Sequence, residues 1–148
     1  IDQYGYAYDI LIYHHQLEEA VRFADRLPAR RLVLDHCAKP PIKEHHITHW
    51  SKQLKELAAR QHIYCKISGL FTEADWKEWR AEDIYPYLDV VMNAFGEDRI
   101  MFGSDWPVCL LAATYAQSCE VLQEYFSRFS KEQQAKFWGE NAKRFYQL

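Results

Sequence analysis

The chain has 148 residues, of which 49% are hydrophobic and 16% aromatic, enough for one domain with a buried core over residues 1–148. A net charge of −3 and a pI near 6.2 exclude a basic surface for nucleic acid and a polybasic membrane anchor. No apolar run approaches the roughly 20 residues needed to span a bilayer, and no secretion signal is recognisable at the start. We therefore expect a cytoplasmic protein that acts on a small molecule.

The four cysteines lie far apart in the sequence, at positions 37, 65, 109 and 119. None forms a Cys-x-x-Cys pair, so neither a structural zinc site nor a redox motif is indicated. We expect reduced and mostly buried thiols. The chain begins with Ile1 instead of methionine, which suggests a processed or truncated polypeptide.

In chain order, the sequence predicts four units that each consist of a short strand and a helix. Apolar β-rich runs predict the strands, at residues 9–13, 32–34, 63–67 and 100–102. Apolar residues at helical spacing follow each run and predict helices within residues 17–27, 50–58, 88–95 and 115–129. The third helix is expected to stop at Gly96. Residues 130–133 have the form of a capping box for a last helix that ends at Gly139.

The predicted strands are apolar throughout their length, as is typical of strands that are buried on both faces. Strands that alternate with helices predict an α/β fold with a parallel sheet and right-handed crossovers. Residues 70–82, which include Trp76 and Trp79, are too long for a minimal connector. This stretch is either a functional loop or a short surface helix pinned by the two tryptophans.

Polar side chains follow each predicted strand at the point where the strand ends. They are His14, His15 and Gln16, then Asp35 and His36, then Lys66 and Ser68, then Ser104 and Asp105. Because the carboxyl ends of parallel strands meet at one edge of a sheet, we expect these side chains to share one site. Consecutive strand residues point to opposite faces, so only one of His14 and His15 is expected to face that site.

Imidazoles and a carboxylate at one edge suit two hydrolytic mechanisms. In the first, they hold a divalent cation that lowers the pKa of a bound water and polarises a carbonyl group. In the second, Asp105 takes a proton directly from water while a protonated His36 or Lys66 stabilises the developing oxyanion. The chain has no Gly-x-Ser-x-Gly motif, P-loop or Gly-x-Gly-x-x-Gly motif, so serine acyl transfer, phosphoryl transfer and dinucleotide binding are not indicated.

Several runs, taken together, resemble the amidohydrolase-2 family over essentially the whole chain. They are His15-Gln16-Leu17, Leu34-Asp35-His36 with Lys39-Pro40-Pro41, Cys65 to Leu70 with Thr72 to Trp76, Phe102 to Val108, and Asn141-Ala142 before Phe145-Tyr146. Each run is weak alone, but their combination in this order is specific. Within the family they most resemble the sugar-lactonase-like branch, which includes L-fuconolactone and L-rhamnonolactone hydrolases.

This resemblance implies a TIM (β/α)8 barrel, of which this chain is the C-terminal half, about four β/α units that correspond to strands 5–8. His15 then matches the fifth-strand histidine, His36 the sixth-strand histidine and Asp105 the eighth-strand aspartate. The same three residues are the expected catalytic residues and the expected metal ligands. The family implies that activated water hydrolyses a lactone ring, with Asp105 as the water activator or a metal ligand.

The expected substrate is a sugar lactone, and the expected substrate-binding residues are Trp76, Trp106, Lys66 and Lys39. The two indoles would form walls for the sugar ring. The expected cofactor is one divalent cation, with zinc favoured. The family's first-strand His-x-His, which would supply two ligands, has no counterpart in this chain, and this weakens the expectation of metal binding by the chain alone.

A barrel of this kind needs roughly 200 residues or more. Four units alone leave two unpaired sheet edges and an exposed apolar inner face. We therefore expect either a homodimer that completes a barrel-like assembly or a fragment of a longer chain. Two other functions stay open, namely a decarboxylase of the wider family and a catalytically silent half-barrel that acts as a binding or interaction module.

Overall fold

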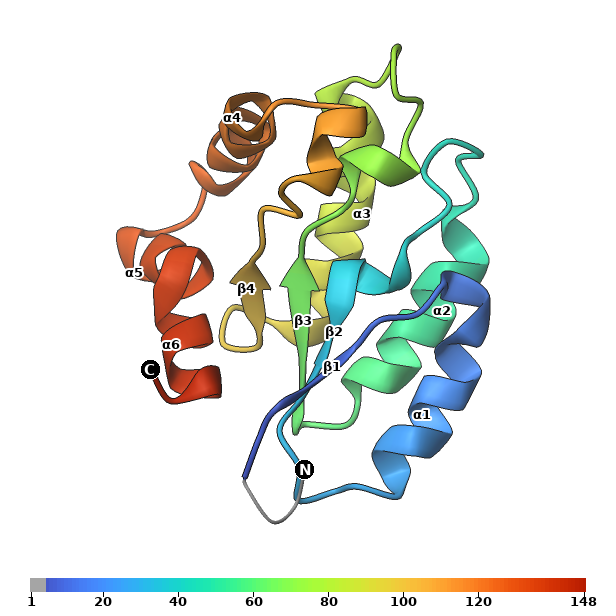
Figure 1. Ribbon diagram of the computed structural model, residues 1–148, viewed down its shortest axis with the longest axis vertical. Helices are drawn as coiled ribbons and strands as arrows, with labels where there is room; N and C mark the ends of the chain where they lie inside the picture. Colours follow the sequence, from blue (N-terminus) through green and yellow to red (C-terminus); the bar gives the residue numbers. More distant parts are fainter. Residues whose placement is uncertain (1–4) are drawn as a thin grey trace.

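Four parallel strands form the centre of the computed structural model, which describes residues 5–148 (Figure 1). They lie in sequence order and are β1 (Tyr8–Ile10), β2 (Leu32–Leu34), β3 (Ile63–Ile67) and β4 (Ile100–Phe102). The register places Leu32 opposite Ile63, and Cys65 opposite Ile100. The predicted α/β fold with a parallel sheet is therefore confirmed. The single-domain prediction begins at residue 1, and its first four residues lie outside the described part.

Helices follow the strands, as the apolar spacing predicts. They are α1 (Leu17–Asp25), α2 (Ile47–Ala58), α3 (Ala81–Phe95), α4 (Tyr115–Phe126), α5 (Lys131–Ala135) and α6 (Asn141–Tyr146). Short 3-10 helices lie at His14–Gln16, Asp35–Ala38, Phe71–Glu73 and Val108–Leu111, and a π-helical turn lies at Lys136–Glu140. The capping box at Ser130 is confirmed, because its hydroxyl accepts a hydrogen bond from the Gln133 N–H at 3.3 Å.

Several predicted element bounds are wrong. Helices α2 and α3 begin before the expected residues 50 and 88, at Ile47 and Ala81. The first strand ends at Ile10 instead of residue 13, because the chain leaves the sheet there and Leu11 and Tyr13 become exposed. The last helical segment does not end at Gly139 but continues through the π-helical turn into α6. Gly139 lies on an open surface, and burial of Phe145 extends the helical path beyond it.

The main hydrophobic core lies between the sheet and helices α1 to α3. Figure 1 shows these helices packed along one face of the sheet. Strand β3 contributes Ile63, Cys65 and Ile67 to this core, while Tyr64 and Lys66 point to the other face. Each fully buried Leu or Ile contributes roughly 1.5–3 kcal/mol relative to an exposed one, so this core fixes the sheet on which the strand ends are mounted.

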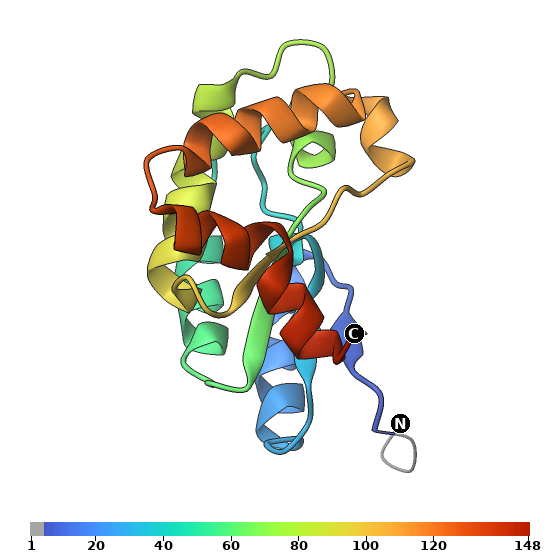
Figure 2. The same cartoon turned by 90° about the vertical axis from the view of Figure 1, so that its left-hand side faces the viewer.

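A second, smaller core covers part of the opposite face of the sheet. It consists of Val33, Met101 and Phe145, with Tyr64 and Tyr146 packed against it. Figure 2 shows the C-terminal helices that carry Phe145 and Tyr146, next to β4. This face is therefore only partly apolar, and it also holds the charged Lys66. Among the described residues, no helix has the length and apolar character needed to cross a bilayer.

The long stretch at residues 70–82 begins with the short 3-10 helix Phe71–Glu73. Trp79 is pinned, because its ring packs on Phe71 with centroids 4.9 Å apart and its indole N–H donates to the Ala112 carbonyl at 2.8 Å. Trp76 is instead 51% exposed, with its N–H donated to the Thr72 carbonyl. The stretch thus combines one anchored tryptophan with one that is free to meet a ligand.

Candidate functional site

Three strand ends come together around His36, which follows β2. Its Nε2 lies 3.6 Å from Oδ1 of Asp105, which follows β4. Its Nδ1 lies 2.7 Å from the hydroxyl of Ser68, which follows β3. The side chains of His36 and Asp105 are largely buried, with 17% and 11% of their surface exposed. The sequence-based expectation that these strand ends share a site agrees with this geometry.

The backbone after β2 makes a left-handed turn that aims His36. The four consecutive residues 36–39 have φ values of 49°, 51°, 58° and 50°. A non-glycine residue in this region costs of order 1–3 kcal/mol, and such strain is concentrated at functional sites. The turn is held from outside, since the buried Trp50 indole of α2 donates a hydrogen bond to the Cys37 carbonyl at 2.8 Å. Asp105 also has a positive φ, at 54°.

Gly69 makes room for the imidazole of His36. A Cβ atom at this position would lie 2.8 Å from Nδ1 and 2.9 Å from Cγ of His36, closer than real Cβ contacts. Gly69 also has a φ of +62°, which disfavours other residues. Two independent constraints therefore require glycine beside the histidine.

The surroundings of Asp105 shift the pKa of its carboxyl group. Burial raises its pKa above the ordinary value of an aspartate. The electrostatic interactions of Asp105 with His36 and Lys39 lower this pKa, whereas the interaction with Asp35 adds to the rise. The net raised pKa makes this carboxylate a stronger proton acceptor than an exposed aspartate, as a general base requires.

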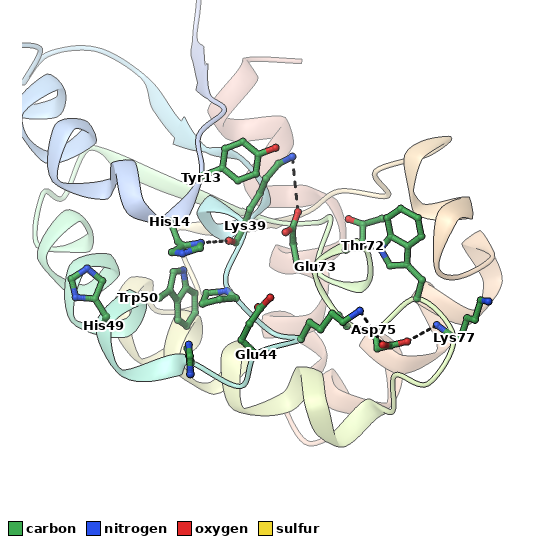
Figure 3. A pocket seen from close by; sticks show the side chains of 15 residues that line it. Tyr13, His14, Lys39, Glu44, His49, Trp50, Thr72, Glu73, Asp75 and Lys77 are labelled. Atoms are coloured by element: carbon green, nitrogen blue, oxygen red, sulfur yellow. Dashed lines mark hydrogen bonds and ion pairs between the residues drawn. The ribbon is translucent and has the colours of Figure 1, made fainter.

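A cavity of about 960 Å³ opens at the same edge of the sheet (Figure 3). The loops after β1, β2 and β3 form its walls. Its lining residues include two that the sequence predicts to bind substrate, Lys39 and Trp76, and three others of interest, Tyr13, His14 and Glu73. The other predicted residues lie outside the lining of this cavity, namely His15, His36, Lys66, Asp105 and Trp106. Asp105 instead lines a separate small hollow with Ser68 and Gly69.

His14 and His15 lie in a 3-10 turn, so the alternation expected of a strand does not apply to them. His14 lines the cavity, and its Nδ1 lies 3.0 Å from the Lys39 carbonyl. The exposed His15 stacks on Tyr13 with ring centroids 5.8 Å apart. A catalytic or metal-binding role of His15 stays a prediction, as does a substrate-binding role of Trp106, which is 64% exposed.

Lys66 is held in a closed cluster below the site. Its Nζ lies 2.6 Å from Asp9 and 2.9 Å from Asp35, and the Tyr146 hydroxyl donates to Asp9 at 2.9 Å. Burial lowers the pKa of Lys66, but the hydrogen bonds that its ammonium group donates to Asp9 and Asp35 outweigh this effect and hold the pKa well above its usual range. This ammonium group is therefore already engaged, and its predicted contact with substrate stays a prediction.

Glu73 is a residue of interest that the sequence-based site did not include. Its carboxylate lies 4.0 Å from the Lys39 ammonium, inside the cavity. Burial raises its pKa, and the electrostatic interactions with Lys39 and His14 oppose this rise. The signal that points to Glu73 is its place in the unusually long stretch at residues 70–82, but nothing in that stretch singles it out.

The described residues alone do not form a complete metal site. No group of three or more histidine, cysteine, aspartate or glutamate side chains within residues 5–148 is arranged to hold an ion. His36 and Asp105 supply two donors, whereas protein zinc sites use three or four. Zinc binding by these two residues therefore needs donors from outside the described part of the chain.

The chain is similar in sequence to known lactonases. The chain is 44% identical to an L-fucono-1,5-lactonase from Burkholderia multivorans, over 97% of this chain and 52% of that enzyme. It is 23% identical to an L-rhamnono-gamma-lactonase from Scheffersomyces stipitis, over its full length and 51% of that enzyme. The chain thus spans about half the length of the curated relatives it matches.

A solved structure of an amidohydrolase from Burkholderia multivorans with bound zinc superposes with a TM-score of 0.92 and 44% identity. The match covers 97% of this chain and 53% of that one, as expected for half of a (β/α)8 barrel. The amidohydrolase family model matches residues 1–148. The chain belongs to the amidohydrolase family, and its relatives include lactone-hydrolysing enzymes.

Proposed function

We propose that this chain is the part of a lactonase that carries the catalytic residues His36 and Asp105. The enzyme opens the ring of a sugar-acid lactone with water. The observation that carries this proposal is the approach of His36 Nε2 to Asp105 Oδ1 at 3.6 Å, from two different strand ends. The 44% identity to an L-fucono-1,5-lactonase supports a lactone as the substrate class. Because the chain spans about half of that relative, the activity is proposed for the complete polypeptide.

In the proposed reaction, Asp105 is the general base. It takes a proton from water as the water oxygen bonds to the lactone carbonyl carbon. The proton passes to Nε2 of His36, which Ser68 holds through Nδ1. His36 then gives it to the ring oxygen as the bond between this oxygen and the carbonyl carbon breaks. The product is the open hydroxy acid, and the raised pKa of Asp105 favours the first proton transfer.

The sugar ring is proposed to lie in the 960 Å³ cavity, with the lactone carbonyl reaching beyond its lining to His36 and Asp105. The support is Lys39, which lines the cavity, shares a turn with His36 and lowers the pKa of Asp105 by its charge. Tyr13 and the exposed Trp76 offer aromatic faces, and Lys39 offers hydrogen-bond donors. The sugar-binding roles of Lys39 and Trp76 are supported by their places in the lining. Lys66 and Trp106 lack that support.

The other half of the barrel is proposed to come from the same polypeptide or from a second copy of this chain. The support is the length of the relatives and the unpaired outer edges of β1 and β4 among the described strands. The four free cysteines, including buried Cys37 and Cys65 with their sulfurs 3.7 Å apart, support a reducing compartment such as the cytoplasm.

The experiment is a substrate screen with the full-length protein, with and without a chelator. Acid release from sugar 1,5-lactones and 1,4-lactones is followed by a pH indicator, and carbon dioxide release from aromatic acids is followed in parallel. The proposal expects lactone opening. Carbon dioxide release without lactone opening would instead identify a decarboxylase, and the absence of both activities would favour a silent binding module.

A further inference from the structure

The ion pair of Lys39 and Glu73 differs from a second ion pair among the cavity-lining residues, that of Lys43 and Asp75, because its charged groups are not within hydrogen-bond distance. Its two charged groups are 4.0 Å apart, too far for a hydrogen bond, although only 26% and 24% of the side-chain surfaces are exposed. The neighbouring pair of Lys43 and Asp75 closes to 3.2 Å, yet it is 62% and 42% exposed. The pair with the less exposed side chains, Lys39 and Glu73 (the open pair), thus has the longer distance between its charged groups.

Both members of the open pair are held in place by the backbone around them. The Lys39 N–H donates to the His36 carbonyl at 2.7 Å, and the Lys39 carbonyl is 3.0 Å from Nδ1 of His14. The Lys39 ammonium lies 4.8 Å from the centre of the Tyr13 ring. On the other side, the Lys43 N–H donates to the Glu73 carbonyl at 3.0 Å. These contacts fix the backbone positions from which the Lys39 and Glu73 side chains extend toward each other (Figure 3).

Two partly buried charges without a hydrogen bond between them are costly unless a third group satisfies them. That group must accept a hydrogen bond from an ammonium and donate one to a carboxylate. A hydroxyl does both. A phosphate or carboxylate ligand would be repelled by Glu73, and a cationic ligand by Lys39. The pair therefore selects a neutral ligand that carries hydroxyl groups.

We infer that Lys39 and Glu73 together bind a hydroxyl group of the substrate ring and set the specificity for polyhydroxylated lactones. This inference rests on the proposed lactonase function for the identity of the ring. The turn of residues 36–39 carries both His36 and Lys39, so it links the reacting carbonyl at Asp105 to the bound hydroxyl. A lactone without hydroxyl groups would be free to sit in other orientations.

The kinetic experiment compares Glu73→Gln with wild type in the full-length protein, using L-fucono-1,5-lactone and the hydroxyl-free δ-valerolactone. We expect the ratio of kcat/KM for the two lactones to fall at least tenfold, because a lost charge-assisted hydrogen bond affects only the hydroxylated substrate. Lys39→Met should lower the same ratio. The control is Glu120→Gln, which removes a carboxylate from the exposed side of α4 and should leave the ratio unchanged. An equal fall for both lactones would overturn the inference.

A binding experiment separates this inference from the proposed function. Isothermal titration with the free pyranose L-fucose requires no hydrolysis. We expect wild type to bind the sugar and Glu73→Gln to bind it at least tenfold more weakly, even if no lactone is opened. Equal binding by the two proteins, or no binding by wild type, would show that the pair does not recognise hydroxyl groups.

Discussion

The two lysines that the sequence predicts to bind substrate, Lys66 and Lys39, have very different surroundings. Lys66 lies between Asp9 and Asp35 at 2.6 Å and 2.9 Å, on the inner face of the sheet. Lys39 lies 4.0 Å from Glu73 at the wall of the cavity. The first ammonium is satisfied within the protein, and the second is not. A charged group such as Lys66, which already contacts its partners, stabilises the fold. A charged group such as Lys39, which lies beside a cavity without a hydrogen bond to its partner, is available to bind a ligand.

The largest effect on stability is expected for Lys66→Met, because it leaves the carboxylates of Asp9 and Asp35 facing each other without a cation. Breaking a buried pair costs about 3–5 kcal/mol, and partial exposure of Asp9 reduces this to about 2–3 kcal/mol. Urea unfolding measures the change. The matched Lys39→Met should cost less than about 1 kcal/mol. Equal losses of stability in the two variants would remove the distinction between the closed and the open pair.

An intermediate effect is expected for Gly69→Ala. The added methyl would collide with the His36 ring, and the left-handed backbone alone costs about 1–2 kcal/mol for alanine. Displacing the imidazole should also lower kcat about tenfold or more. Gly139→Ala is the control, since its Cβ would meet nothing within 4 Å. Wild-type stability and kcat in Gly69→Ala would show that His36 does not need this space.

The smallest effect is a pH dependence at the open pair. Burial raises the folded-state pKa of Glu73 above its unfolded value, so the folded protein binds this proton more tightly. The resulting stabilisation is present at low pH and is lost as the pH rises through the folded pKa. Relative to wild type, Glu73→Gln should therefore be more stable at pH 7 than at pH 3.5, as urea unfolding at both values can show. A relative stability that is the same at both pH values would contradict this assignment.

Much of the fold can be predicted from local sequence, for a physical reason. The strands at 32–34, 63–67 and 100–102 are short apolar runs between turn-forming residues, and they need no long-range information. The end of β1 could not be predicted in this way, because residues 11–13 are apolar or aromatic yet leave the sheet. The end of the last helix depends on the burial of Phe145, which is a tertiary contact.

The site, like the fold, can be predicted from the sequence only in part. That His36 and Asp105 meet follows from the rule that parallel strands end at one edge, which needs only the order of the elements. The closed cluster of Lys66 depends on Tyr146, which meets Asp9 across 137 positions of sequence, and no local pattern reports such a contact. The left-handed turn at residues 36–39 contains no glycine from which it could be predicted. Glu73 is identified as a candidate site residue only by its distance from Lys39, which the sequence does not show.

The catalytic role of Asp105 is tested most directly by the activity of Asp105→Asn in the full-length protein. We expect kcat/KM for L-fucono-1,5-lactone to fall by about 10²–10⁴, as for the loss of a general base. The free energy of unfolding should stay within about 1 kcal/mol of wild type, because burial already disfavours the charge of this carboxylate. Wild-type lactone hydrolysis by a correctly folded Asp105→Asn would contradict the central claim that His36 and Asp105 form the catalytic pair.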